Sequence, residues 1–186
     1  MTTQIEPCDF AEIIREETPQ AVRVADYLAL HSLSRIIDVG CGPGIYVTAM
    51  RDVGLDAYGI DNDDRLPDKP WFQRVDLAGF PPTNLGDPFD VALSLEVGEH
   101  LPETMADRYV RALENTGAKI IYFSAARPGQ GGHGHINCQP KAYWVERFHR
   151  AGFWLDPDAT DRWLSFMRSG YHMGWLTQNG LVLKRA

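Results

Sequence analysis

Three glycines at alternate positions form the most distinctive pattern in this chain. The loop reads G-C-G-P-G at residues 40–44 and follows the apolar stretch RIIDV. Glycine lets the backbone come close to a bound molecule, because no side chain intervenes. The third glycine of a dinucleotide fingerprint would fall at Ile45, and no Gly-Lys-Ser/Thr of a P-loop follows. The loop therefore predicts close backbone approach to a ligand without the pyrophosphate arrangement, or else an ordinary tight turn.

Three aspartates lie at the ends of consecutive apolar segments. Asp38 lies just before the glycine loop, Asp61 ends the stretch DAYGID, and Asp76 lies near the end of FQRVDL. A carboxylate about 20 residues beyond the first glycine accepts hydrogen bonds from a ribose diol in nucleotide-binding sheets. We therefore expect Asp61 to bind a ribose and Asp76 to meet an exocyclic amine. Asp38 is placed to accept a bond from an ammonium group or from loop amides.

Two histidines are candidates for proton transfer. His100 follows the apolar stretch FDVALSLEV and should lie near the same edge as the aspartates. An imidazole titrates near neutral pH, so it can act as a general base. The alternative is a loop histidine that caps the following helix. His135 is a second candidate base, from the glycine-rich loop RPGQGGHGHINCQP of residues 127–140.

Loops of this length often bind ligands or close over them. We expect His133 and Asn137 to contact a substrate, and Tyr171, further along the chain, to close over it. A metal site made by His133, His135 and Cys138 is an alternative, but the spacing matches no standard zinc pattern. A flexible loop held by its own hydrogen bonds is another. We expect no resident metal.

Strand-like and helix-like segments alternate along the chain, and most of the candidate residues lie at the ends of the strand-like segments or in the loops that follow them. The expected strands are 35–39, 56–61, 72–77, 89–97, 119–126 and 180–185, and the expected helices are 18–33, 45–54, 103–117 and 141–152. Apolar strands that alternate with helices indicate a parallel sheet covered on both faces. Such a sheet binds ligands outside the carboxyl ends of its strands, where the aspartates and His100 fall.

The successive stretches IIDVGCGPG, YGID, VDL and FDVALSLEVGEHLP resemble the ordered motifs of class I S-adenosylmethionine-dependent methyltransferases. The resemblance covers roughly residues 20–125. It implies an α/β fold: a Rossmann-like, doubly wound, seven-stranded sheet, mostly parallel with an antiparallel last strand and helices on both faces. The chain is then a single domain of residues 1–186, in which an N-terminal helical segment, 1–33, could fold over the cofactor as a lid.

The same resemblance implies a set of cofactor contacts. The loop around the methionine part would be Asp38, Gly40, Cys41, Gly42 and Gly44. Asp61 would be the ribose ligand, and Asp76 and Leu77 would contact the adenine. Glu96 and Val97 would form the wall after the fourth strand, and Asn62 is also expected among the cofactor contacts. The cofactor would be S-adenosyl-L-methionine and the product S-adenosyl-L-homocysteine. A sulfonium methyl is already electrophilic, so the protein need only align donor and acceptor and exclude water.

Length, charge and missing motifs limit the number of domains and the class of methyl acceptor. The 186 residues suffice for one domain, and a net charge of −7 disfavours nucleic acid as a partner. The Asn/Asp-Pro-Pro-aromatic run of base-amine enzymes and a Pro-Cys nucleophile are both missing. We expect transfer to an O or N of a small molecule, with a non-catalytic cofactor-binding scaffold or a nicotinamide-dependent oxidoreductase as alternatives.

Three cysteines, Cys8, Cys41 and Cys138, do not form a disulfide framework. No apolar run reaches the roughly 20 residues of a membrane helix. We therefore expect a cytoplasmic protein without a membrane partner. The oligomeric state is not predicted.

Overall fold

The computed structural model describes residues 10–31, 33–63, 66, 69–77 and 86–186. The helices are α1 (Phe10–Leu30), α2 (Ile45–Asp52), α3 (Ala106–Asn115), α4 (Lys141–Arg150), α5 (Pro157–Arg168) and α6 (Gly174–Asn179), with the 3-10 helices η1 (Gly98–His100) and η2 (Glu103–Met105). The strands are β1 (Arg35–Val39), β2 (Asp56–Asp61), β3 (Phe72–Arg74), β4 (Val91–Leu95), β5 (Ile120–Ser124), β6 (Phe153–Leu155) and β7 (Leu181–Arg185).

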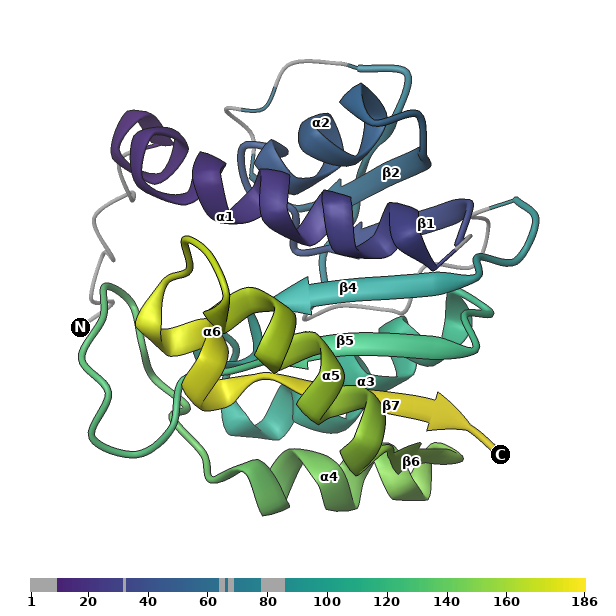
Figure 1. Ribbon diagram of the computed structural model, residues 1–186. Coiled ribbons are helices and arrows are strands. Elements are labelled where there is room, and N and C mark those ends of the chain that lie inside the picture. The colour runs from purple at the N-terminus through teal and green to yellow at the C-terminus, as the bar shows by residue number, and fades with distance from the viewer. Residues whose placement is uncertain (1–9, 32, 64–65, 67–68, 78–85) are drawn as a thin grey trace.

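The seven strands form one sheet in the order β3-β2-β1-β4-β5-β7-β6. Strands β1 to β5 pair in parallel, whereas β7 runs antiparallel to both β5 and β6. The predicted Rossmann-like sheet with an antiparallel last strand is confirmed. In Figure 1 the carboxyl ends of the parallel strands point to the left, toward the loop of residues 127–140 and α6.

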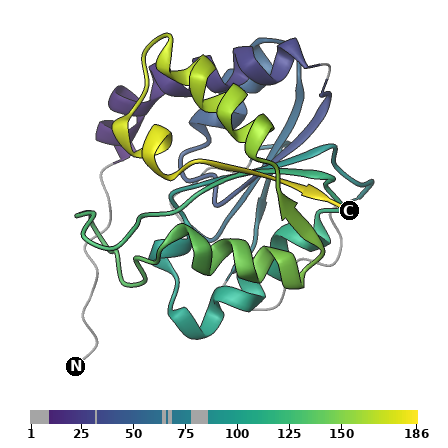
Figure 2. The ribbon, with the colours of Figure 1, turned by 60° about the horizontal axis from the view of Figure 1, so that its bottom comes forward.

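Helices cover both faces of the sheet, as Figure 2 shows. One face packs against α1, α2, α5 and α6, with Trp163 of α5 fully buried at its centre. The other packs against α3 and α4, where Trp144 is 1% exposed. Burying side chains of this kind stabilises the fold by about 1.5–3 kcal/mol each. The two apolar layers hold the strand ends, and therefore the site, in place.

Strands β1 and β2 have the expected bounds, whereas β3, β4, β5 and β7 are shorter than the runs that predict them. The run 89–97 gives a strand of residues 91–95, for example. The helix expected at 18–33 begins earlier, at Phe10. Besides the short η1, three elements lie outside the expected ranges: the helix α5, the three-residue β6, and α6, which includes Trp175. Residues 1–9 of the expected N-terminal segment, Cys8 among them, and residue 32 lie outside the described residues.

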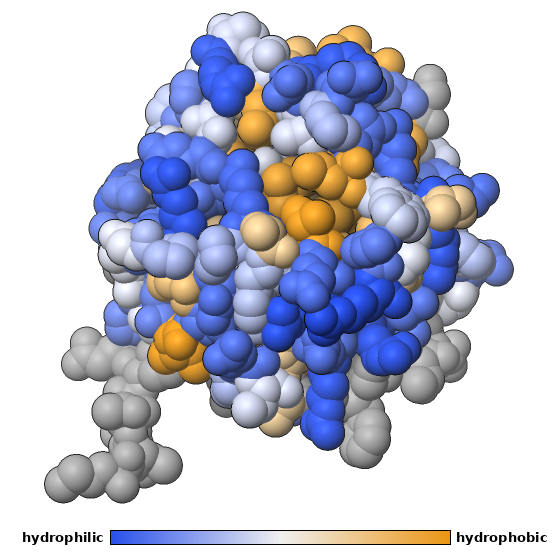
Figure 3. Space-filling view, turned by 90° about the horizontal axis from the view of Figure 1, so that it is seen from below, coloured by the Kyte–Doolittle hydropathy of each residue, from blue (hydrophilic) through white to orange (hydrophobic). Residues whose placement is uncertain are grey.

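The surface is mainly polar. Seen from below in Figure 3, it is mostly hydrophilic, with a larger hydrophobic area near the centre of the view and smaller ones elsewhere. Among the described residues, no helix is both long enough and apolar enough to cross a membrane.

Candidate active site

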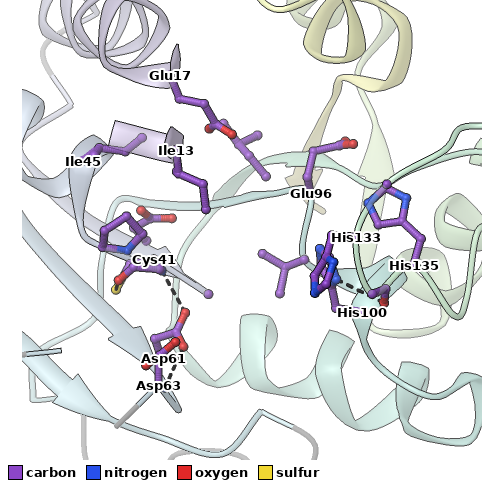
Figure 4. Close-up of a pocket in the computed structure, with 18 of the residues that line it drawn as sticks. Ile13, Glu17, Cys41, Ile45, Asp61, Asp63, Glu96, His100, His133 and His135 are labelled. Carbon is purple, nitrogen blue, oxygen red and sulfur yellow. Dashed lines mark hydrogen bonds between the residues drawn. The ribbon is translucent and has the colours of Figure 1, made fainter. Parts of the chain in front are cut away.

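A cavity of about 1650 Å³ opens at the carboxyl ends of the parallel strands. Figure 4 shows Cys41 and Asp61 on one side of it and His100, His133 and His135 on the other. Helix α1 contributes further lining residues from above, so the described part of the segment expected to be a lid does border the cavity. The expected site residues that line it are Asp38, Gly40, Cys41, Gly42, Asp61, Asn62, Asp76, Leu77, Glu96, Val97, His100, His133 and His135.

The three glycines of the loop serve different needs, although each has a positive φ. A Cβ at Gly40 would lie 2.5 Å from Cγ2 of Val97, and one at Gly44 would lie 2.6 Å from Cη2 of Trp71. A Cβ at Gly42 would meet nothing within 4 Å. Glycine is therefore required at residues 40 and 44 by the protein's own packing, and only Gly42 exposes its backbone to open space. Gly44 does not line the cavity.

Asp61 holds the glycine loop in place. Its carboxylate accepts a hydrogen bond of 2.8 Å from the Gly42 amide and one of 3.0 Å from the Asp63 amide. The carbonyl of Ile60 accepts from the amides of Gly40 and Cys41 at 2.8 and 3.1 Å. The end of β2 thus fixes the loop, while each Asp61 oxygen keeps a second lone pair for a ligand donor.

Asp38 is a buried carboxyl group in need of a partner. It is 3% exposed, and its Oδ2 makes no hydrogen bond in the described part of the chain. Burial, followed by the nearby charges of Asp61 and Glu17, raises the pKa of Asp38 well above its usual range. An ammonium group placed here would relieve the missing bond and the like-charge repulsion. The site therefore fits a positively charged amino-acid tail.

Cys41 offers no nucleophile, because burial raises the pKa of its thiol. Its sulfur packs where a Cβ on Gly59 would lie, 2.7 Å away. Cys41 and Cys138 are both free thiols, as expected for a chain without a disulfide framework.

Glu96 has an unusual backbone and a central position. Its φ of 52° lies in the left-handed region, which is rare for residues other than glycine. Its carboxylate accepts hydrogen bonds from Gln130 Nε2 at 2.7 Å and from Asn179 Nδ2 at 3.1 Å. These hydrogen bonds connect Glu96, which follows β4, to the loop of residues 127–140 and to α6. The sequence reasoning did not find the two amide side chains.

His100 and His135 form a cluster with the buried Glu99. The rings of His100 and His135 lie edge to face with centroids 5.0 Å apart. His100 Nδ1 lies 3.2 Å from the Gly134 carbonyl oxygen. Glu99 is fully buried, and its Oε1 lies 3.9 Å from His135 Nε2 and accepts from the Ala126 amide at 3.0 Å.

Burial is the main cause of the pKa shifts in this group. It raises the pKa of Glu99 to about 8, with repulsion from Glu96 as the next cause. Although the His100 side chain reaches the surface, partial desolvation by the groups around it lowers its pKa, and neighbouring His135 lowers it further. Sequence reasoning missed Glu99, whose only signal is its place one residue before His100.

Two residues expected to contact the substrate, Asn137 and Tyr171, are not among those that line the cavity. Asn137 is 3% exposed and donates to the Gly98 carbonyl oxygen at 3.4 Å, so it anchors the loop to η1. Tyr171 is exposed, and its hydroxyl donates to the Glu16 carbonyl oxygen at 3.2 Å. Cys138 contacts the Gln130 carbonyl, at 3.8 Å, and is not grouped with the histidines.

Comparison with solved structures shows the same fold in several methyltransferases. A magnesium protoporphyrin IX methyltransferase from Synechocystis, solved with bound SAH, is 17% identical with a TM-score of 0.65, covering 97% of this chain and 89% of that one. An amino pentose methyltransferase from Micromonospora echinaspora, solved with bound SAM, is 16% identical with a TM-score of 0.66, covering 97% and 99%. A sugar N-methyltransferase from Streptoalloteichus is 14% identical with a TM-score of 0.62, covering 95% and 89%.

No curated protein matches the chain in sequence. A protein family described as a methyltransferase domain matches residues 12–181, which is nearly the whole chain. That match includes every element of the cavity from α1 to the start of β7. The chain belongs to the methyltransferase domain family.

Proposed function

We propose that this methyltransferase uses S-adenosyl-L-methionine to methylate an O or N atom of a small-molecule acceptor. The observation that supports the proposal is that the glycine loop, its carboxylates and the histidines all line one and the same cavity. The bound cofactor supplies an electrophilic methyl group on a sulfonium, and S-adenosyl-L-homocysteine leaves. The protein's contribution is to align this methyl with the acceptor atom.

On the side of the cavity that we propose for the cofactor, each part of S-adenosylmethionine has a residue of suitable chemistry to bind it. Asp38 receives the ammonium of the methionine part, and the exposed backbone at Gly42 lies along it. Asp61 accepts from the ribose hydroxyls, with Asn62 beside it. Asp76 and Leu77 border the adenine, through a hydrogen bond to its amine and an apolar contact.

The charge of the cavity suits a cationic donor. Its acidic lining residues are Glu12, Glu16, Glu17, Asp38, Asp61, Asp63, Asp76 and Glu96. Arg74 is the one lysine or arginine among the described lining residues. A negative cavity raises the local concentration of a ligand that carries sulfonium and ammonium groups. It also disfavours a polyanionic acceptor such as nucleic acid.

On the acceptor side, the reacting atom lies beside Glu96, Val97 and the histidines. His100 and His135 remain the residues proposed to act on the acceptor's proton, and His133 borders the same space. Two of the methyltransferases with this fold are named for small polar acceptors, an amino pentose and a sugar. Their chemistry, a hydroxyl or amine on a small ring, is the class that we propose here.

Calorimetry and a transfer assay test the proposal. We expect the purified chain to bind S-adenosylmethionine and S-adenosylhomocysteine, and to transfer labelled methyl groups from the former to a fraction of a metabolite extract. His100→Ala should leave cofactor affinity nearly intact and reduce turnover. Binding of NAD in place of S-adenosylmethionine would refute the cofactor assignment, and binding without transfer to any fraction would refute catalysis in favour of a scaffold.

A further inference from the structure

Glu99, His100 and His135 bring a carboxylate oxygen and two imidazole nitrogens together at the acceptor side of the cavity. The three donor atoms all lie within 4.8 Å of one another. Two of the residues come from η1, and the third comes from the loop of residues 127–140. Figure 4 shows both imidazoles on the same side of the cavity, across from Asp61. Two histidines and one carboxylate are a donor set that binds divalent transition metals.

A buried carboxylate oxygen without a partner supports a cation at this cluster. Glu99 is fully buried, and its Oε2 makes no hydrogen bond among the described residues. Leaving such an atom without a partner costs free energy, which an ion bound to the carboxylate would offset. His135 faces the same carboxylate through Nε2, which lies 3.9 Å from Glu99 Oε1 and is the nitrogen that it offers to an ion.

The surroundings already orient the donors. His100 Nδ1 lies 3.2 Å from the Gly134 carbonyl oxygen, so this nitrogen carries the proton and Nε2 keeps its lone pair for an ion. The Ala126 amide fixes one oxygen of Glu99 at 3.0 Å. A Cβ at Gly132 would overlap the His135 ring, so the glycine lets the chain pack directly on that imidazole. Carbonyl and amide partners of this kind typically hold metal ligands in position.

The loop that carries His135 is fastened to the residue that carries the carboxylate. The Glu99 carbonyl accepts hydrogen bonds of 2.9 Å from the amides of both Ile136 and Asn137. The buried Asn137 side chain adds its bond to Gly98. Histidine and glutamate are thus held in fixed register across 36 residues of sequence, counted from 99 to 135. This gives the buried Asn137 a purpose other than substrate contact.

We propose that Glu99, His100 and His135 bind a divalent transition-metal ion of the Mn²⁺, Fe²⁺, Co²⁺ or Zn²⁺ class, which binds and activates the methyl acceptor. This revises our sequence-based expectation of no metal, and its catalytic part rests on the proposed function. Metal bonds of about 2.0–2.2 Å require donors no more than about 4.4 Å apart, so the imidazoles must rotate slightly inward. His100 is exposed and has room to do so.

Three protein ligands leave coordination positions open for an acceptor oxygen. A hydroxyl bound there loses its proton to water more readily, because the ion stabilises the resulting anion. His100 and His135 then act on the acceptor's proton through the ion that they hold, in place of accepting it themselves. The oxygen then forms a bond to the methyl carbon while the carbon–sulfur bond breaks, and its electron pair stays on sulfur. The products are a methyl ether, S-adenosylhomocysteine and one proton. The site therefore favours an acceptor with a hydroxyl, and a second neighbouring oxygen would complete chelation.

Metal binding can be measured without any knowledge of the acceptor. Metal-free protein is titrated with MnCl₂, CoCl₂ and ZnCl₂ by calorimetry, and the visible absorption of bound Co²⁺ reports its ligands. We expect one ion per chain, with affinity lowered about tenfold or more in His100→Ala and in His135→Ala. His172→Ala is the matched control, because His172 also bonds a backbone carbonyl, at 3.1 Å, but belongs to no such group.

Cofactor affinity shows that the variants are folded, and it separates the two proposals. S-adenosylhomocysteine should bind normally to both histidine variants, since its expected contacts lie across the cavity. Absence of metal binding to the wild-type chain, or equal metal binding by the His100→Ala/His135→Ala double variant, would overturn the metal site while leaving the cofactor assignment standing. Methyl transfer that survives complete metal removal would overturn the catalytic use of the ion.

Discussion

Val97 closes so tightly over Gly40 that a Cβ at residue 40 would lie 2.5 Å from Val97 Cγ2. This contact joins the end of β1 to the turn after β4, and it brings the donor and acceptor sides of the cavity together. The glycine is therefore required for packing between strands, in addition to any part in ligand binding.

Gly40→Ala should destabilise the fold by about 2–4 kcal/mol, because it adds the clash to the strain of a φ of +83°. Gly42→Ala is the matched control: a Cβ there meets nothing, so only about 1–2 kcal/mol of backbone strain is expected. Urea unfolding measures both. Equal destabilisation by the two substitutions would show that Val97 does not constrain residue 40.

Asp61→Ala should weaken S-adenosylmethionine binding by about 1.5–3 kcal/mol, since it removes charge-assisted bonds to the ribose and frees the Gly42 amide. Calorimetry gives the dissociation constant directly. Asp56→Ala, at the opposite end of β2, should leave that constant unchanged. An Asp61 variant with wild-type affinity would reject the ribose assignment.

Asp38→Asn should stabilise the cofactor-free protein at neutral pH while weakening cofactor binding. The pKa of Asp38 is raised in the folded state, so folding favours the protonated group. The stability that it contributes is present below the unfolded pKa and is lost as pH rises through the folded one. Asparagine avoids that loss but cannot pair with an ammonium. Melting temperatures across pH would test this, and a variant no more stable than wild type at pH 8 would contradict it.

Asp156→Ala should cost about 1–2 kcal/mol of stability and leave the cofactor affinity unchanged. The Asp156 carboxylate caps α5 by accepting from the Ala159 amide at 2.8 Å, and it pairs with Lys184 at 2.6 Å. The bond with Lys184 lowers the pKa of Asp156. The stabilisation is therefore present at neutral pH and is lost as pH falls through the lowered value.

Urea unfolding at pH 7 and in acid checks this behaviour. The difference between wild type and Asp156→Ala should shrink in acid. Asp161→Ala, which removes an exposed carboxylate from the same helix, is the control and should have little effect at either pH. A difference that persists unchanged in acid would rule out the charged cap.

The sheet and the places of its strand-end aspartates could be predicted because they rest on local patterns. Apolar runs broken by glycine and ended by aspartate fix β1 and β2 and place Asp38 and Asp61 at one edge. The three-residue β6 could not be found in this way, because so short a run carries no periodicity. Its place comes from pairing with β7, which is a tertiary contact.

The acceptor side was harder to predict because it depends on burial. Nothing in the string LEVGEHLP distinguishes the fully buried Glu99 from Glu96, whose carboxylate faces the cavity. Likewise Gly44 is explained by Trp71, 27 residues away, through a contact that no local motif encodes. The sequence led us to expect that Asn137 contacts a substrate, whereas in the structure its side chain is hydrogen-bonded to Gly98 and anchors the loop.

The loop of residues 127–140 leaves the sheet after β5 and ends where α4 begins, and both elements are packed into the core. It contributes residues to the proposed acceptor side of the cavity, whereas residues at the ends of β1 and β2 line the proposed donor side. Exchange of this one segment, by recombination or in the laboratory, is therefore a route to new product selectivity that leaves cofactor recognition in place.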